Sequence, residues 1–264
     1  MDPSAFVPFA HRLADAAREE TLPRFRAALD VDNKREASFD PVTDADREAE
    51  RAIRVLIEAE HPTHGILGEE LGERVGTEGL RWVLDPVDGT RSFICGVPLW
   101  TTLIALEHEG EPKLGLIDQP VVGERWVGLG ERTELHARGA VRTVRTSGCT
   151  TLEDARISTT DPRAAAYFGA TDAEAFGRLA GRCKLARFSM DAYAYALLAT
   201  GQLDLVVESA LAHYDFAALA PVIRGAGGVI TSWTGEAFDA GRGGYTLAAA
   251  TPELHAAALE VLGA

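Results

Sequence analysis

The run Trp-Val-Leu-Asp-Pro-Val-Asp-Gly-Thr at residues 82–90 constrains the fold of this chain more than any other segment. Its first three residues are apolar, as in a buried strand. Pro86 has no N–H for a strand ladder, so the strand is predicted to end at Asp85. The following Asp-Gly-Thr can form a turn that opens a helix. The two aspartates and the carbonyl of Val87 can then face one point at the end of the strand.

The rest of the chain mixes apolar, β-branched runs with amphipathic helical patterns. These patterns predict helices over residues 5–29, 44–59, 173–181, 192–199, 215–225 and 252–262. Strands are predicted over residues 65–67, 82–84, 101–107, 114–117, 124–129, 155–158, 184–187 and 203–207, with a hairpin turn at 109–112. This mixed order predicts a layered α/β (α+β) architecture in a single domain of residues 1–264, with a soft internal boundary near Gly148.

Two of the predicted helices carry specific end signals. Pro23 predicts a kink or break within the first helix, because proline removes a helical hydrogen bond. Thr43 precedes the second helix and Asp46 follows three residues later, which is close to a capping-box arrangement.

Charge and cysteine content narrow the classes of partner. The chain has 26 Lys and Arg against 40 Asp and Glu, a formal charge of −14. Such a surface repels nucleic acid, anionic membranes and, unless cations intervene, a phosphate ester. The sequence has no apolar run of about 18 residues, so we expect no membrane helix. The N-terminus lacks a secretory pattern. The three cysteines show no paired spacing, so we expect a reducing, cytoplasmic setting.

Three acidic clusters are candidates for a metal site: Glu69 after a glycine, the Asp-Pro-Val-Asp segment, and Asp215 after His-Tyr. Hard carboxylate and carbonyl oxygens of this kind suit Mg²⁺. Gly89 permits close backbone approach, and its amide with that of Thr90 can bind a phosphate at a helix start. Taken singly, Glu69 and its neighbour Glu70 could be a solvated surface pair, the Asp-Pro-Val-Asp segment a polar turn, and Asp215 a helix N-cap. The metal interpretation depends on their combination.

The order and spacing of these motifs, together with Gly-Ala-Gly-Gly-Val at residues 225–229, resemble the inositol monophosphatase superfamily over nearly the whole chain. The resemblance implies the αβαβα five-layer sandwich shared with fructose-1,6-bisphosphatases. It also implies a Mg²⁺-dependent phosphomonoesterase with two or three metal ions per site, acting on a small phosphate ester, and a homodimer.

The resemblance further implies a role for each matching residue. The implied metal ligands are Glu69, Asp85, the Val87 carbonyl, Asp88 and Asp215. Glu69 and Thr90 would position the attacking water, which makes them catalytic residues together with Asp88. The amides of Gly89 and Thr90 would receive the phosphate, and Asp46 matches an acidic position near the metals. No cysteine or serine shows the context of a nucleophile, so direct attack by a metal-activated water is expected.

Within the superfamily, the chain is most similar to histidinol-phosphate phosphatases in residues 89–106, 117–120, 124–126 and 191–195. Histidinol phosphate carries an ammonium and an imidazole, which favour carboxylates at the far end of the pocket. We expect Asp191, Glu208 and Arg91 to bind this substrate. Two purely structural roles remain open: a helix N-cap at Asp191 and a solvated strand end at Glu208.

Some residues depart from the histidinol-phosphatase pattern. Ser189 and Met190 stand where two glycines are common, and Met190 is expected to narrow the pocket. Ala212-His213 stands where a Lys-Pro pair is common. His213 is expected to face solvent, and the alternative is that it contacts the substrate. The alternative activities are inositol-1-monophosphatase or hydrolysis of another polyol or nucleotide phosphate. A non-enzymatic alternative is a regulatory or RNA-binding partner that keeps the fold.

Overall fold

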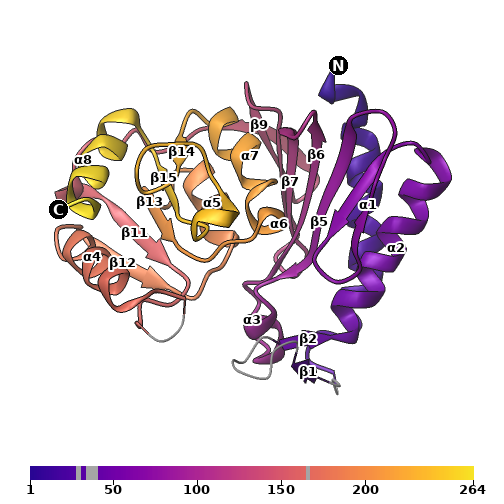
Figure 1. The fold of residues 1–264 in the computed structure, drawn as a ribbon, viewed down its shortest axis with the longest axis horizontal. Coiled ribbons are helices and arrows are strands. Elements are labelled where there is room, and N and C mark those ends of the chain that lie inside the picture. The colour runs from indigo at the N-terminus through magenta and orange to yellow at the C-terminus, as the bar shows by residue number, and fades with distance from the viewer. Residues whose placement is uncertain (28–30, 34–40, 165–166) are drawn as a thin grey trace.

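Helices and sheets alternate in five layers along the long axis of the molecule (Figure 1). The structure is a computed structural model that describes residues 1–27, 31–33, 41–164 and 167–264. The larger sheet has eight strands, in the spatial order β10 (Ala140–Val144), β9 (Thr133–Ala137), β8 (Glu124–Gly128), β7 (Glu111–Gln119), β6 (Thr101–His108), β5 (Leu80–Asp88), β3 (Gly65–Gly68) and β4 (Gly72–Arg74).

The second sheet has five strands, in the order β12 (Leu185–Phe188), β11 (Arg156–Thr159), β13 (Leu205–Glu208), β15 (Thr246–Ala249) and β14 (Val229–Thr231). A separate two-stranded ribbon pairs β1 (Val31–Asn33) with β2 (Pro41–Thr43). The chain passes from the larger to the smaller sheet between Val144 and Arg156.

Two helices, α1 (Val7–Thr21) and α2 (Asp44–Glu60), cover the outer face of the larger sheet. Leu13 and Ile53 from these helices pack in one core with Trp82 of the sheet. Both bonds of the predicted capping box at the start of α2 are present.

Three short helices fill the layer between the sheets: α5 (Tyr193–Ala199), α6 (His213–Phe216) and α7 (Leu219–Gly225). On the outer face of the smaller sheet lie α4 (Ala170–Ala180) and α8 (Pro252–Leu262). The predicted αβαβα sandwich is therefore confirmed. The remaining helical segments are α3 (Thr90–Ile94), η1 (Pro3–Phe6), η2 (Leu152–Asp154) and η3 (Ala240–Arg242).

Several predicted boundaries are wrong. The first helix ends at Thr21 instead of continuing to residue 29, which agrees with the predicted break at Pro23. Leu22 keeps helical dihedrals, but proline has no N–H for the next helical hydrogen bond. Residues 28–29 of that prediction lie outside the described residues. The helix predicted over 215–225 is two helices, α6 and α7. The short strands β1, β2, β4, β9, β10, β14 and β15 were not predicted.

The predicted end of the strand at Asp85 is also wrong. β5 continues to Asp88, and its register with β6 shifts between Asp85 and Asp88. Two residues of β5, Pro86 and Val87, stand opposite the single residue Thr102 of β6, which is a β-bulge. The Thr102 hydroxyl of β6 donates to the carbonyl of Pro86 at 2.7 Å, so the bulge is held by the neighbouring strand.

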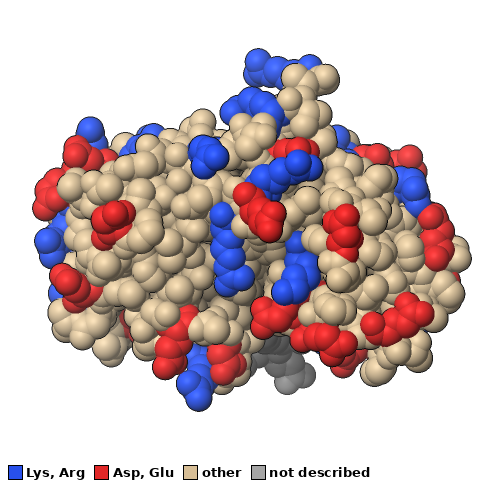
Figure 2. Space-filling view, turned by 90° about the horizontal axis from the view of Figure 1, so that it is seen from above, with Lys and Arg blue, Asp and Glu red and all other residues tan. Residues whose placement is uncertain are grey.

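The surface carries both signs of charge. Figure 2 shows acidic and basic side chains interspersed over the face seen from above, without one continuous basic patch on that face. In the described part of the chain, none of the helices has the length and apolar character needed to cross a membrane. All three cysteines are free thiols.

Candidate active site

A pocket of about 310 Å³ opens between the two sheets. One wall comes from β5, α3 and the residue after β3; the other comes from the ends of β11 and β13 and from the start of α5. The residues that line it are Glu69, Asp85, Val87, Asp88, Gly89, Thr90, Arg91, Thr160, Tyr167, Asp191, Ala192, Tyr195, Glu208, Ser209, Ala210, Leu211, Ala212, Tyr214, Asp215 and Leu219. With the exception of Asp46, every predicted site residue lines this pocket.

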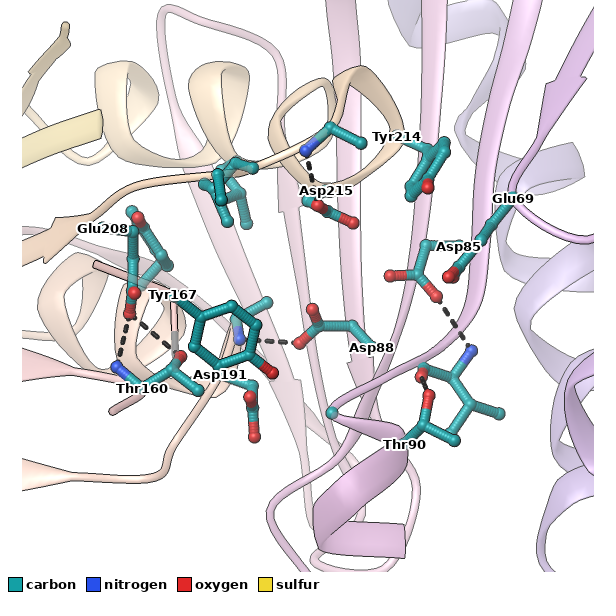
Figure 3. Close-up of a pocket in the computed structure, with 18 of the residues that line it drawn as sticks. Glu69, Asp85, Asp88, Thr90, Thr160, Tyr167, Asp191, Glu208, Tyr214 and Asp215 are labelled. Atoms are coloured by element: carbon teal, nitrogen blue, oxygen red, sulfur yellow. Dashed lines mark hydrogen bonds between the residues drawn. The ribbon is translucent and has the colours of Figure 1, made fainter. Parts of the chain in front are cut away.

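Three carboxylates form the centre of the pocket. Asp85, Asp88 and Asp215, here called the acidic triad, each offer an oxygen within 4.8 Å of the other two. The bulge in β5 places Asp85 and Asp88 side by side, and α6 brings Asp215 from a distant part of the sequence. Figure 3 shows all three pointing into the same space, with Glu69 on the side of Asp85.

Backbone amides fix the direction of each member of the acidic triad. Asp85 Oδ1 accepts from the amide of Val87 at 3.1 Å. Asp88 Oδ2 accepts from the amide of Ala192 at 2.7 Å, and Asp215 Oδ2 accepts from the amide of Ala212 at 2.7 Å. Asp215 is the third residue of α6, so the simple N-cap interpretation of this residue is wrong.

The acidic triad concentrates negative charge away from water. Burial raises the pKa of Asp85 well above its ordinary value, and the charges of Glu69, Asp88 and Asp215 add to the effect. Burial likewise raises the pKa of Asp88, followed by the charges of Asp191 and Asp215. A cation among these oxygens would offset both the burial and the repulsion.

The start of α3 lies beside the acidic triad. Gly89 precedes the helix with a φ of +84°, a conformation that favours glycine. The Thr90 hydroxyl lies 3.2 Å from the Val87 carbonyl and 3.4 Å from Asp46 Oδ1. Asp46 is buried behind this threonine, outside the pocket lining, and burial raises its pKa to about 6 against the opposing bonds from Thr43.

The opposite side of the pocket, here called the far wall, consists of Thr160, Tyr167, Asp191 and Glu208 (Figure 3). Glu208 Oε1 accepts from the amide and the hydroxyl of Thr160 at 2.7 and 3.0 Å. Glu208 is 3% exposed, and burial raises its pKa to about 8. The interpretation of Glu208 as a solvated strand end is therefore wrong.

Asp191 does not cap α5. Its Oδ2 accepts from the Ser92 hydroxyl at 3.1 Å, and the cap residue Ala192 donates its amide to Asp88 instead. A Cβ on Gly89 would lie 2.8 Å from Asp191 Oδ2, so glycine allows this carboxylate to approach the turn. Asp191 itself has a φ of +46°.

The sequence model of the inositol monophosphatase family matches residues 2–263 of this chain. The chain belongs to the inositol monophosphatase family. It is 46% identical over 236 residues to the bifunctional phosphatase IMPL2, chloroplastic, of Arabidopsis thaliana, covering 88% of this chain and 66% of the plant protein. It is 36% identical over 236 residues to a histidinol-phosphatase of Streptomyces coelicolor, covering 86% of each. An inositol monophosphatase from Zymomonas mobilis has a TM-score of 0.86 at 38% identity, with 100% of both chains covered.

This member of the inositol monophosphatase family is a phosphatase, and enzymes of the family are metal-dependent, typically on Mg²⁺. The donor set fits such an ion. Mg²⁺ prefers oxygen ligands and is commonly held by one or two carboxylates with waters and substrate phosphate completing its shell. The acidic triad presents three converging carboxylates, and burial together with neighbouring negative charges raises the pKa values of Asp85 and Asp88.

The structure places three residues that depart from the histidinol-phosphatase pattern. Met190 packs against the core between the sheets and is not among the described residues lining the pocket. Ser189 has a φ of +64°, where glycine would be unstrained. His213 begins α6, is partly exposed, and its Nε2 lies 2.5 Å from Oε1 of the buried Glu107; it is not among the described residues that line the pocket.

The pocket residues of this phosphatase that were missed in the sequence include Thr160, Tyr167 and Tyr195. The Arg91 guanidinium lies 4.8 Å from the centre of the Tyr167 ring, which joins the two walls. Thr160 and Tyr167 stand in a segment without a motif, so no local signal identifies them. Tyr195 stands within the Asp-Ala-Tyr-Ala-Tyr stretch at 191–195, where its spacing from Asp191 places both near the start of one helix.

Proposed function

We propose that this phosphatase hydrolyses histidinol phosphate to histidinol and phosphate, with Mg²⁺ as its metal. The observation that carries the proposal is a pair of carboxyl groups, the half-buried Asp191 and the buried Glu208, across the pocket from the acidic triad. Histidinol phosphate has a cationic end and an anionic end. The pocket offers carboxylates to the first and, with metal bound, positive charge to the second.

The charge balance favours a cationic leaving group over a neutral polyol. Burial raises the pKa values of Asp191 and Glu208, so ionising either one without a counter-charge costs free energy. An ammonium or imidazolium would supply that counter-charge within the pocket. A polyol hydroxyl can donate a hydrogen bond to either carboxylate, but it brings no positive charge to offset the carboxylate's charge.

The proposed roles of the site residues follow their positions. Asp85, Asp88 and Asp215, with Glu69 and the Val87 carbonyl, would hold the metal ions. Bound Mg²⁺ would supply an activated water at neutral pH and positive charge for the phosphate.

The chain's own polar groups would complete the site. The amides of Gly89 and Thr90, at the start of α3, would donate to the phosphate oxygens. Glu69 and the Thr90 hydroxyl would accept from and orient the attacking water. Asp46 would keep that hydroxyl in place from behind.

Inositol 1-phosphate is the second candidate substrate, because the structurally similar protein from Zymomonas mobilis is described as an inositol monophosphatase. A panel of histidinol phosphate, inositol 1-phosphate and a nucleoside 3′-phosphate, each with saturating Mg²⁺, separates these activities by kcat/KM. We expect histidinol phosphate to exceed the others by more than about tenfold, the effect of one charge-assisted contact. Equal values, or a preference for inositol 1-phosphate, would contradict the substrate assignment.

We also propose that residues 1–264 form one domain, because the pocket takes its walls from both halves of the chain. The homodimer and the cytoplasmic setting expected from the sequence stay part of this proposal. Light scattering on the purified protein tests the dimer, and turnover that is lost on chelation tests the regulatory alternative.

A further inference from the structure

We propose that the Tyr195 hydroxyl binds the leaving group of the substrate by donating a hydrogen bond to it. The identity of the leaving group rests on the proposed function, whereas the contact itself rests on the position of this hydroxyl.

Tyr195 lines the pocket from α5, yet it is only 2% exposed and its ring packs in the core between the sheets. Its hydroxyl has no hydrogen-bond partner among the residues that the structure describes. A buried hydroxyl without a partner costs about 1–3 kcal/mol, so such a group calls for an explanation. Other buried polar atoms without a described partner, such as those of Trp100 and Ser158, do not line the pocket.

The surroundings of the hydroxyl place it between the two walls. Burial raises the pKa of Tyr195 well above its ordinary value, followed by the charges of Glu208, Asp88 and Asp215 in that order. The proton therefore stays on the oxygen, and the group is a donor. Tyr195 lines the same pocket as Glu208 and Asp191 of the far wall, which is the side proposed to bind the leaving group.

Serine and threonine hydroxyls near the far wall already donate to protein acceptors. Ser92 donates to Asp191, Thr160 donates to Glu208, and Ser209 donates to the carbonyl of Tyr167 at 3.0 Å. The carboxylates here supply only acceptors while ionised. A leaving group that also has an acceptor, such as the hydroxyl oxygen or a neutral imidazole nitrogen of histidinol, needs a donor, and Tyr195 provides one.

The chain contains a matched control two residues away. Tyr193 is also on α5, but its hydroxyl donates to Glu124 at 3.0 Å, and it lies outside the described lining of the pocket. Replacing either tyrosine by phenylalanine removes one hydroxyl and keeps the ring. The two variants differ in whether that hydroxyl already has a partner in the protein.

The test compares wild type, Tyr195→Phe and Tyr193→Phe. For Tyr195→Phe we expect kcat/KM for histidinol phosphate to fall about 3- to 10-fold, the effect of one neutral hydrogen bond. Its melting temperature should be unchanged or higher, because a hydroxyl without a protein partner leaves the core. Tyr193→Phe should keep kcat/KM and melt at a lower temperature.

Product inhibition locates the contact. In Tyr195→Phe, the inhibition constant of histidinol should rise about 3- to 10-fold, and that of inorganic phosphate should stay unchanged. A rise for phosphate alone would place the hydroxyl on the phosphoryl group and overturn the inference. Unchanged kinetics with both products would overturn it as well.

Failure of the proposed function has a different signature. If the wild type does not turn over histidinol phosphate, the substrate assignment is wrong. The same variants are then compared with inositol 1-phosphate as substrate and with inositol and phosphate as inhibitors. The Tyr195 contact would still be supported if kcat/KM fell only in Tyr195→Phe and if, of the two products, only inositol bound more weakly. If neither quantity changed, the contact would be refuted.

Discussion

The two walls of the pocket hold negative charge in different ways. In the acidic triad, carboxylates lie within 4.8 Å of one another, and their mutual charge adds to burial in raising the pKa of Asp85. On the far wall, Glu208 accepts three hydrogen bonds from Thr159 and Thr160 that oppose the effect of burial.

The comparison indicates two kinds of recognition. The acidic triad is a site in which the missing charge must come from bound cations. The far wall is a site that the protein has already organised with its own donors. Breaking the first should stop the reaction, whereas breaking the second should change which ester is preferred. Removing the metal, or changing one carboxylate at a time, tests this difference.

Removal of the metal should abolish turnover. With Mg²⁺ taken away by exhaustive chelation, no cation offsets the acidic triad, so the phosphate is repelled and no activated water forms. Activity should return on adding Mg²⁺, and Li⁺ should inhibit, as the family resemblance implies. Phosphate release before and after chelation is the measurement, with circular dichroism to verify the fold. Full activity in the chelated protein would refute a metal mechanism.

Asp88→Asn should reduce kcat by about 10²–10³, the usual effect of losing one preorganised electrostatic group. The amide keeps the size of the side chain and can still accept from Ala192. The exposed Asp154→Asn is the matched control and should leave kcat unchanged. A folded Asp88→Asn enzyme with the wild-type kcat would show that this carboxylate is not needed in the acidic triad.

Asp191→Asn should lower kcat/KM for histidinol phosphate about 10- to 100-fold, since one charge-assisted hydrogen bond contributes about 1.5–3 kcal/mol. Turnover of the uncharged-alcohol ester inositol 1-phosphate should change much less, because the acidic triad is intact. Both substrates are measured on one preparation of the variant. Parallel losses would mean that Asp191 is structural and would remove the distinction between the walls.

Glu208→Gln should change the pH dependence of stability. Burial raises the pKa of Glu208 from 4.5 to about 8, so the folded state holds a proton that the unfolded state releases above its own pKa. Wild type should therefore lose stability relative to the variant as pH rises from about 5 to about 8. Thermal melts of both proteins without metal or substrate measure this. A difference in melting temperature that stays constant over this range would contradict the raised pKa.

Local sequence signals predicted the side of the site that is contiguous in the chain. The strand and turn at 82–90 carry Asp85, Asp88, Gly89 and Thr90 together, and the structure places all four in the pocket. The spacing of Thr43 and Asp46 predicted a capping box that is present. These features depend on neighbours a few residues apart, so the sequence shows them directly.

The missed features depend on tertiary contacts. Pro86 favours the end of a strand, but the Thr102 hydroxyl of the neighbouring strand holds its carbonyl and β5 continues as a bulge. The edge strand β10 is exposed over its first four residues, and in the described part of the chain it pairs with β9. Tyr167 reaches the pocket because Ser209 binds its carbonyl from a strand end 42 residues away.

The close approach at Gly89 limits how this enzyme can be redesigned. A single added carbon at residue 89 would lie 2.8 Å from Asp191 Oδ2, and Asp191 is itself held by Ser92. Residue 89 must therefore stay glycine while aspartate stands at residue 191. Engineering of the preferred ester should vary the charge at residue 191 and seek new volume at Tyr167 or Thr160, where the pocket borders other segments.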